Sequence, residues 1–107
     1  MVLVFTRIMD KKNKKGYEKM LTQTITIRNA EGLHCRPASV FVEEMAKYNC
    51  DVTICFKGER INAKSILSIM TSCIVCGSEI TIECDGEDEK QAMNAAVKLI
   101  QSEFKKY

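Results

Sequence analysis

The chain has one histidine, His34, and one proline, Pro37, in 107 residues, so any chemistry that needs histidine is confined to one position. No apolar run is long enough to cross a membrane. The apolar segment at residues 1–9 precedes a basic cluster, which is the reverse of the order in a secretory signal. The chain is short and has few paired acid and base groups, which argues against an enzyme acting alone. We therefore expect one small cytoplasmic domain.

A strong positive charge is also missing from most of the chain. Residues 1–19 carry six basic and two acidic side chains, a net charge of +4. Residues 20–107 carry ten basic and twelve acidic side chains, a net charge of −2, so the overall +2 comes from the leader. A nucleic-acid partner is therefore not indicated. The hydrophobic content of 46% is sufficient for one core.

Thiols, in contrast, are frequent. The even number of cysteines would suit disulfides in a secreted protein, but without a secretory signal free thiols in a reducing cytosol are expected. Several occupy apolar positions in strand patterns, where cysteine acts as a small hydrophobic residue. The six are Cys35, Cys50, Cys55, Cys73, Cys76 and Cys84.

His34 immediately precedes a segment with helical periodicity. Apolar residues recur at positions 38, 41, 42, 45 and 46, which predicts an amphipathic helix over about residues 35–48. If His34 is the N-cap, Pro37 is the third helical residue, where it removes no intrahelical hydrogen bond. Free backbone N–H groups, the positive end of the helix dipole and the Arg36 guanidinium then lie beside the imidazole. This arrangement suits an anion, and a phosphoryl group is one that imidazole can carry covalently.

The remaining patterns predict an α+β domain of two layers with the order β-α-β-β-α-β-α. Alternating strands and a tight turn at Lys57-Gly58 favour an antiparallel sheet with helices on one face. Ser65 should cap a short helix, and Asp88 with Gln91 should form a capping box for the last helix. The strands are expected at residues 22–28, 51–56, 59–63 and 78–84, and the apolar stripe of the last helix at Ala92, Met93, Ala96, Val97, Ile100 and Phe104.

The string Gly32-Leu33-His34-Cys35-Arg36-Pro37-Ala38 resembles the active-site motif of the HPr family, the histidine-containing phosphocarrier proteins of the phosphoenolpyruvate:sugar phosphotransferase system. The family pattern is G-[LI]-H-[AT]-R-P-A. The segment from Ala63 to Met70 resembles the family's regulatory-serine helix, and residues 77–89 resemble its last strand and the entry to its last helix. The resemblance covers about residues 20–104, which is nearly the whole domain.

This resemblance implies both a fold and an activity. The fold is an HPr-like open-faced β-sandwich, with a four-stranded antiparallel sheet and helices on one face. Enzyme I, charged from phosphoenolpyruvate, would phosphorylate Nδ1 of His34, and EIIA components would then receive the group for sugar uptake. Arg36 and the Cys35 backbone N–H would stabilise the phosphate, and Pro37 would shape the helix start. No cofactor, no metal and no membrane insertion are expected, and the protein should be a cytoplasmic monomer.

The resemblance also implies a regulatory site at Ser65. In related proteins of low-GC Gram-positive bacteria, an ATP-dependent HPr kinase/phosphorylase modifies this serine and creates a surface for a catabolite-control transcription factor. The added charge would lie near Ile66, Leu67 and Met70, the expected docking patch for Enzyme I and EIIA. The alternatives are that Ser65 is a plain N-cap and that the three apolar residues belong to the core.

Residues 1–19 do not fit the domain. The polar run at residues 11–15 is expected to be disordered or loosely attached. Lys14-Lys15-Gly16 must be encoded by purine-rich codons that resemble a ribosome-binding site shortly before Met20. We therefore expect Met20 to be the natural start of a domain over residues 20–107. A genuine but dispensable tail is the alternative, and N-terminal mass spectrometry of the native protein separates the two.

Some residues depart from the family pattern. Cys35 replaces the usual alanine or threonine, and Cys73 stands where glycine is common. Cys73 and Cys76 have the CxxC spacing of some redox and metal sites, and Cys35 with His34 could complete a zinc set if the loops converged. Glu31 could approach the phosphoryl group and raise its transfer potential. Two rival functions follow, a regulatory-only HPr-like protein acting through Ser65 and a thiol or metal-binding module.

Overall fold

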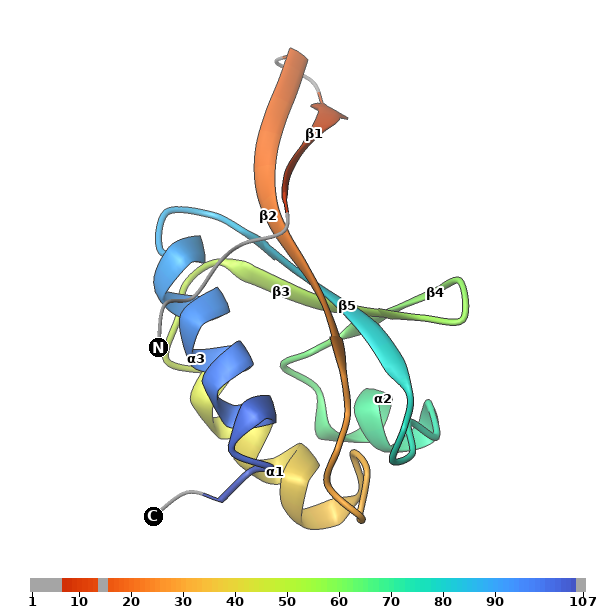
Figure 1. The fold of residues 1–107 in the computed structure, drawn as a ribbon. Helices are drawn as coiled ribbons and strands as arrows, with labels where there is room; N and C mark the ends of the chain where they lie inside the picture. The colour runs from red at the N-terminus through yellow and green to blue at the C-terminus, as the bar shows by residue number, and fades with distance from the viewer. Residues whose placement is uncertain (1–6, 14–15, 106–107) are drawn as a thin grey trace.

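The computed structural model describes residues 7–13 and 16–105. In these residues one antiparallel sheet, with strand order β1-β2-β5-β3-β4, is covered on one face by helices (Figure 1). The elements are β1 (Arg7–Asn13), β2 (Gly16–Thr26), α1 (Cys35–Met45), β3 (Asp51–Phe56), β4 (Glu59–Asn62), α2 (Ile66–Thr71), β5 (Glu79–Asp85) and α3 (Glu89–Gln101).

The predicted fold class is confirmed. From β2 onward, the elements follow the expected order β-α-β-β-α-β-α, and β2, β5, β3 and β4 form the four-stranded antiparallel sheet. The face without helices carries polar side chains. The Thr24 and Thr81 hydroxyls lie 3.0 Å apart there, across β2 and β5. On the same face, Arg60 forms an ion pair with Glu83 at 2.6 Å. The sheet is therefore open on one side.

The N-terminal segment differs from the prediction. Residues 7–13 form β1, which pairs antiparallel with β2 from Arg7↔Thr22 to Asn13↔Gly16. Strand β5 pairs with β2 only from Leu21 onward, so the earlier part of β2 has backbone groups that β5 does not reach. Strand β1 lies on the opposite edge of β2 from β5 and pairs with the backbone groups of that edge, and strand pairing depends on the backbone more than on the charged side chains that favoured disorder. The expected start at Met20 stays a prediction, and positions 1–6 and 14–15 lie outside the described residues.

The core lies between the sheet and the helices. Every residue predicted for the apolar stripe of the last helix is buried, although α3 itself ends at Gln101. Phe104 follows the helix and packs edge-to-face on Phe41 of α1, with ring centroids 6.4 Å apart. From the sheet, the inward side chains include Leu21, Val52, Ile54, Ile61, Ile80, Ile82 and Cys84. The packing of Phe104 on Phe41 places the segment after α3 against α1, the helix whose N-cap is His34.

The start of α3 corrects one prediction. Asp88 is the N-cap, but among the described residues its side chain makes no capping hydrogen bond. Its carboxylate instead accepts the backbone N–H groups of Asn49 at 2.7 Å and Cys50 at 2.9 Å. The predicted capping box with Gln91 is therefore wrong, because two amides of the loop before β3 occupy the same carboxylate. Asp88 joins that loop to α3.

These contacts predict an effect of pH on stability. The Asn49 N–H, with a smaller contribution from Cys50, holds the pKa of Asp88 below its ordinary value of 3.8. A carboxyl group whose native pKa is depressed stabilises the fold above its unfolded pKa, and this stabilisation is lost as the pH falls through the native pKa. Asp88→Asn should therefore lower the melting temperature at pH 7 and flatten its fall below about pH 4. Thermal melts from pH 7 to pH 2 would show this, with the exposed Glu87→Gln as control; an unchanged acid limb in Asp88→Asn would contradict it.

Candidate functional site

His34 stands exposed at the start of α1. It is the N-cap, with extended backbone angles of φ −90° and ψ −163°, and its carbonyl accepts the Ala38 N–H at 2.8 Å. The helix begins at Cys35, so the N–H groups of Cys35 and Arg36 have no intrahelical acceptor. Pro37 is the third helical residue, as predicted, and it is buried. An accessible imidazole therefore lies beside backbone donors at the positive end of a helix.

The loop before His34 is held in place by backbone contacts. The Asn29 side chain is buried and its Nδ2 donates to the Gly32 carbonyl at 2.8 Å, while the Gly32 N–H donates to the Asn29 carbonyl at 3.0 Å. The Leu33 N–H then donates to the Ile74 carbonyl at 2.9 Å. Gly32 has φ +64°, and a Cβ there would lie 2.5 Å from that same carbonyl oxygen. Only glycine fits this close approach, so the motif glycine sets the position of His34.

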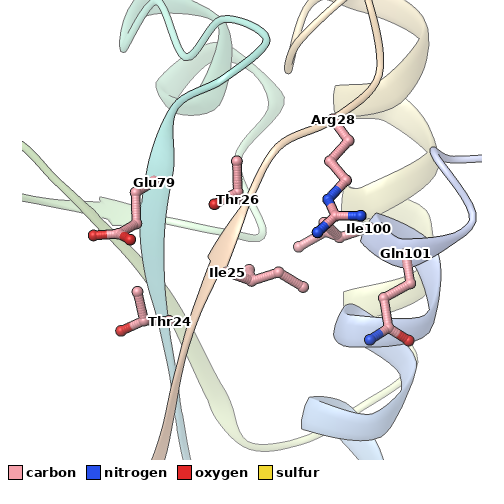
Figure 2. Close-up of a pocket in the computed structure, with 7 residues that line it drawn as sticks. All are labelled: Thr24, Ile25, Thr26, Arg28, Glu79, Ile100 and Gln101. Carbon is pink, nitrogen blue, oxygen red and sulfur yellow. The ribbon is translucent and has the colours of Figure 1, made fainter.

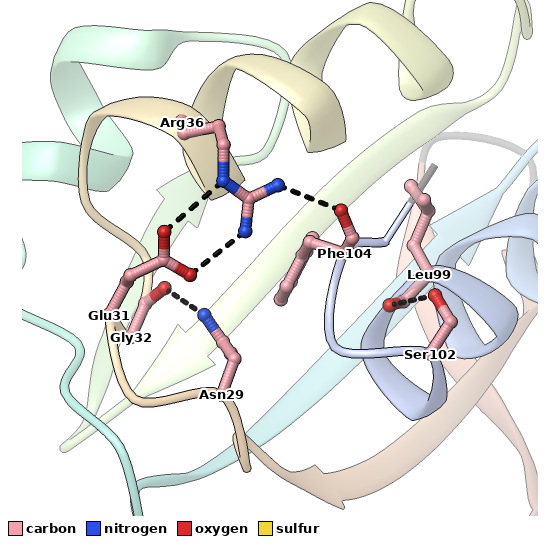
Figure 3. A network of polar contacts seen from close by, with 7 residues as sticks. All are labelled: Asn29, Glu31, Gly32, Arg36, Leu99, Ser102 and Phe104. Carbon is pink, nitrogen blue, oxygen red and sulfur yellow. Dashed lines mark hydrogen bonds and ion pairs between the residues drawn. The ribbon is translucent and has the colours of Figure 1, made fainter. Parts of the chain in front are cut away.

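Arg36 is already engaged within the protein (Figure 3). Its Nη2 donates to Glu31 Oε1 at 2.8 Å and its Nε donates to Glu31 Oε2 at 3.1 Å, a bidentate pair. Its Nη1 donates to the carbonyl of Phe104 at 2.9 Å. Glu31 was expected to approach the phosphoryl group, and Arg36 to serve as a fixed charge for it. In this structure the two side chains bind each other, and the end of the chain holds the arginine from the other side.

The pair is exposed, yet each partner favours the charged form of the other. Hydrogen bonding from Arg36 lowers the pKa of Glu31, with a smaller contribution from Asn29. The hydrogen bond to Glu31 raises the pKa of Arg36. Both side chains are about half exposed, so the strength of the pair depends on salt concentration. The guanidinium is thus partly neutralised before any phosphate arrives.

Ser65 caps α2, as predicted. Its hydroxyl accepts the Ser68 N–H at 3.2 Å, and the side chain is half-buried. Of the three docking residues, Leu67 is 72% exposed and Ile66 is 41% exposed, whereas Met70 is half-buried against the core. Val75, which no sequence pattern singled out, is also exposed and lies next to the place where a Gly32 Cβ would be. These apolar side chains therefore lie on α2, which packs on α1, and on the segment that contacts the His34 loop.

Cys73 occupies a strained position after α2. Its φ is +58°, a conformation that costs an L-residue about 1–2 kcal/mol and glycine little. Because the thiol is exposed, little packing is lost on its removal. Cys73→Gly should therefore stabilise the protein by about 1 kcal/mol, measured as a shift of the urea unfolding midpoint. Cys73→Ala keeps the Cβ and serves as control; an equal gain from alanine would show that the backbone is not the cause.

All six cysteines lie in the described ranges and are free thiols. Burial raises the pKa of Cys50 to about 11, and burial raises the pKa of Cys84 further, so both thiols are protonated and unreactive at neutral pH. Cys35, Cys73 and Cys76 are exposed. Across the described residues, no three histidine, cysteine or acidic side chains gather in a way that could hold a metal ion. The zinc set considered for Cys35, Cys73 and Cys76 is not assembled in this part of the chain.

One hollow in the surface is separate from the predicted phosphoryl site. A hollow of about 500 Å³ lies between β2 and the end of α3, where Ile25 points toward Ile100 (Figure 2). None of the predicted site residues lines this hollow. The residues that line it are Thr24, Ile25, Thr26, Arg28, Glu79, Ile100 and Gln101. His34 instead lies on an open surface, which suits contact with another protein more than enclosure of a small substrate. No helix in the described residues is long and apolar enough to span a membrane.

Comparison with known proteins decides the family. The family model described as "PTS HPr component phosphorylation site" matches residues 21–102. The chain belongs to the HPr family. It is 40% identical to the phosphocarrier protein HPr of Buchnera aphidicola over 74 residues, which cover 69% of this chain and 87% of that protein. It is 36% identical to the HPr-like protein Crh of Bacillus subtilis over 84 residues, 78% of this chain and 99% of Crh.

The structural comparison agrees. A solved HPr chain of Thermoanaerobacter tengcongensis has a TM-score of 0.77 and 36% identity to this chain, covering 80% of this chain and 97% of that one. HPr from the same organism has also been solved as a dimer. The protein is thus an HPr-family phosphocarrier of the phosphotransferase system, and the family predicted from the sequence motif is confirmed. The Glu31–Arg36–Phe104 network was missed, and only the spacing of Glu31 and Arg36 on either side of His34 could have suggested part of it.

Proposed function

We propose that this HPr-family protein accepts a phosphoryl group on Nδ1 of His34 from Enzyme I and passes it to EIIA components for sugar uptake. The observation that carries the proposal is the exposed imidazole at the N-cap of α1, inside a segment that matches the family's phosphorylation-site model. The free N–H groups of Cys35 and Arg36 support it, because they can donate to phosphate oxygens. Exposed Leu67, Ile66 and Val75 supply an apolar docking surface on which partner proteins could bind.

The transfer itself asks little covalent chemistry of the protein. The lone pair of Nδ1 forms the new N–P bond, the bond from phosphorus to the donor atom breaks, and the donor atom keeps that electron pair. Transfer to EIIA is the same exchange in the other direction. Because the group must move both onto and off the ring at similar free energy, the site should stabilise phosphate only modestly. A few backbone donors on an open surface fit this requirement.

The test is incubation with Enzyme I and labelled phosphoenolpyruvate, followed by addition of EIIA. We expect label that is lost in acid, as a phosphoramidate is, and that moves to EIIA when EIIA is added. Intact mass measured at alkaline pH should show one phosphoryl group on each chain. Absence of label with an active Enzyme I would overturn the proposal and turn attention to Ser65 and the cysteines.

A regulatory role through Ser65 is a second candidate, as a further control on the carrier or, in the alternative, as the protein's main function. It is favoured by the position of Ser65 beside exposed Ile66 and Leu67 and by the similarity to Crh. A phosphate on Ser65 could accept the Ser68 N–H that the hydroxyl accepts now, so the fold should tolerate it. Its charge would then weaken apolar docking of Enzyme I and EIIA and offer a surface to a catabolite-control transcription factor.

Incubation with HPr kinase/phosphorylase and ATP, followed by mass mapping, tests this role. We expect one acid-stable phosphate on Ser65 and none in Ser65→Ala, with the neighbouring Ser68→Ala as control. An unmodified serine in the presence of an active kinase would contradict it. We further propose that the protein acts in the cytoplasm as a monomer; light scattering tests the monomer, and a dimer mass would overturn it.

A further inference from the structure

Glu31 and Arg36 lie on either side of His34 in the sequence and are bound to each other in the structure. Both carboxylate oxygens of Glu31 accept hydrogen bonds from the guanidinium, at 2.8 and 3.1 Å. The carbonyl of Phe104 takes a third donor, at 2.9 Å. These contacts occupy three of the five N–H groups of the arginine. The guanidinium of Arg36, two residues after His34, therefore already holds an anion.

The same donors are the ones that a phosphoryl group on His34 would attract. A phosphate carries more charge than a carboxylate and accepts bidentate hydrogen bonds from arginine in the same geometry. In the unphosphorylated protein, the carboxylate satisfies the guanidinium. In the phosphorylated protein, the phosphate must either share Arg36 with Glu31 or displace it. The carboxylate thus stabilises the unphosphorylated protein more than the phosphorylated one.

We propose that Glu31 is a positioning residue that holds Arg36 as a competing anion and thereby raises the phosphoryl-transfer potential of His34. The inference rests on the proposed function and deepens it. Phosphorylation breaks the Glu31–Arg36 pair, and departure of the phosphoryl group to an acceptor restores it. Re-formation of the pair then favours departure of the group, so an exposed ion pair makes the carrier a better donor. No atom of Glu31 joins the reaction, and the bonds formed and broken remain those at His34 and the donor or acceptor.

The experiment is a competition between wild type and Glu31→Gln for phosphoryl groups. Wild type labelled with ¹⁵N and the unlabelled variant are mixed with catalytic Enzyme I and a limiting amount of phosphoenolpyruvate. Reversible transfer through Enzyme I lets the groups equilibrate between the two proteins, and intact mass at alkaline pH gives the phosphorylated fraction of each. We expect the equilibrium to favour Glu31→Gln by about two- to fivefold, the range typical of an exposed ion pair. A ratio of one or below would overturn the proposal.

Two further variants separate this role from a merely structural one. Glu31→Asp keeps the charge and should return the ratio toward one. Glu87→Gln removes an exposed carboxylate that lies two residues after the end of β5, outside the Glu31–Arg36 pair. It should leave the ratio of the phosphorylated fractions at one. A damaged His34 loop would lower uptake in Glu31→Gln instead of raising its share. A shift of the same size in Glu87→Gln would show a general charge effect and overturn the proposal.

The role of Arg36 is tested by the same competition in an Arg36→Ala background. Because Glu31 is proposed to act by holding the arginine, more than half of the advantage of the glutamine variant should disappear there. If half or more of that advantage remained, the carboxylate would act directly on the phosphate. This result would overturn the proposal that Arg36 exchanges Glu31 for the phosphate. Failure of wild type to become phosphorylated would overturn the proposed function as well. Phosphorylated wild type with an equal phosphorylated fraction of Glu31→Gln would overturn this inference alone.

Discussion

Replacing His34 with alanine is expected to abolish uptake of acid-labile phosphate and leave the fold intact. The imidazole is the only histidine side chain, so no other ring nitrogen can accept the group. It is exposed and, within the described structure, makes no capping hydrogen bond, so its removal should change the free energy of unfolding by no more than about 0.5 kcal/mol. Uptake from Enzyme I and labelled phosphoenolpyruvate measures the first effect, and a urea titration followed by circular dichroism measures the second.

The matched control for His34→Ala is Cys35→Ala. Cys35 is exposed and is the next residue in the helix, but only its backbone N–H is expected to contact phosphate. Alanine retains that N–H, so uptake should continue at a rate close to that of wild type. Acid-labile label that persists in His34→Ala would show that another residue is the acceptor. Loss of uptake in Cys35→Ala would mean that the thiol contributes directly.

The second large effect is expected from Gly32→Ala, which should destabilise the protein by about 2–4 kcal/mol. Part of this comes from the left-handed backbone at φ +64°, which costs an L-residue about 1–2 kcal/mol. The rest comes from the new Cβ, which would lie 2.5 Å from the Ile74 carbonyl oxygen and 2.8 Å from the Val75 Cα. Neither atom is the end of a flexible side chain, so the two loops must separate. A loss of this size is a large fraction of the stability of a small domain.

Gly58→Ala is the comparison that isolates the close approach. Gly58 also has a positive φ, +82°, but apart from the glycine and its two chain neighbours no atom of the described residues lies within 4 Å of the position that a Cβ would take there. It should therefore cost only about 1–2 kcal/mol, from the backbone alone. Urea titration of both variants measures the difference, and phosphoryl uptake should fall in Gly32→Ala alone, since only that change moves the His34 loop. Equal costs would show that the contact with Ile74 is unimportant.

Local patterns predicted much of the fold because they depend on neighbouring residues. The apolar spacing from Ala38 gave the buried Phe41 and Met45 of α1, although the helix ends at Met45 and the predicted Ala46 is exposed. Alternation gave inward side chains of β3 and β5. Ser65 was predicted as a cap because a hydroxyl at that position has a nearby backbone donor. The N-cap of α1 at His34 was likewise expected from the residues that follow it. In each case a few consecutive residues carry the whole signal.

The parts that could not be predicted depend on contacts between distant segments. Asp88 has the right side chain for a helix cap, yet amides near Cys50 bind it, and the sequence does not say which partner wins. Arg36 is held by the carbonyl of Phe104, and any residue could supply a carbonyl. The pairing of β1 with β2 is a backbone interaction that the charged leader did not indicate. Such competition is decided by the tertiary arrangement.

The bond from Arg36 Nη1 to the Phe104 carbonyl has a practical consequence for handling the protein. Phe104 is part of the surroundings of Arg36, and Tyr107 follows it by three positions in the sequence. A polyhistidine tag joined after Phe104 would add extra imidazoles to a protein in which His34 is the only histidine. An N-terminal or cleavable tag keeps the label on a single ring and leaves the arginine with its natural neighbours.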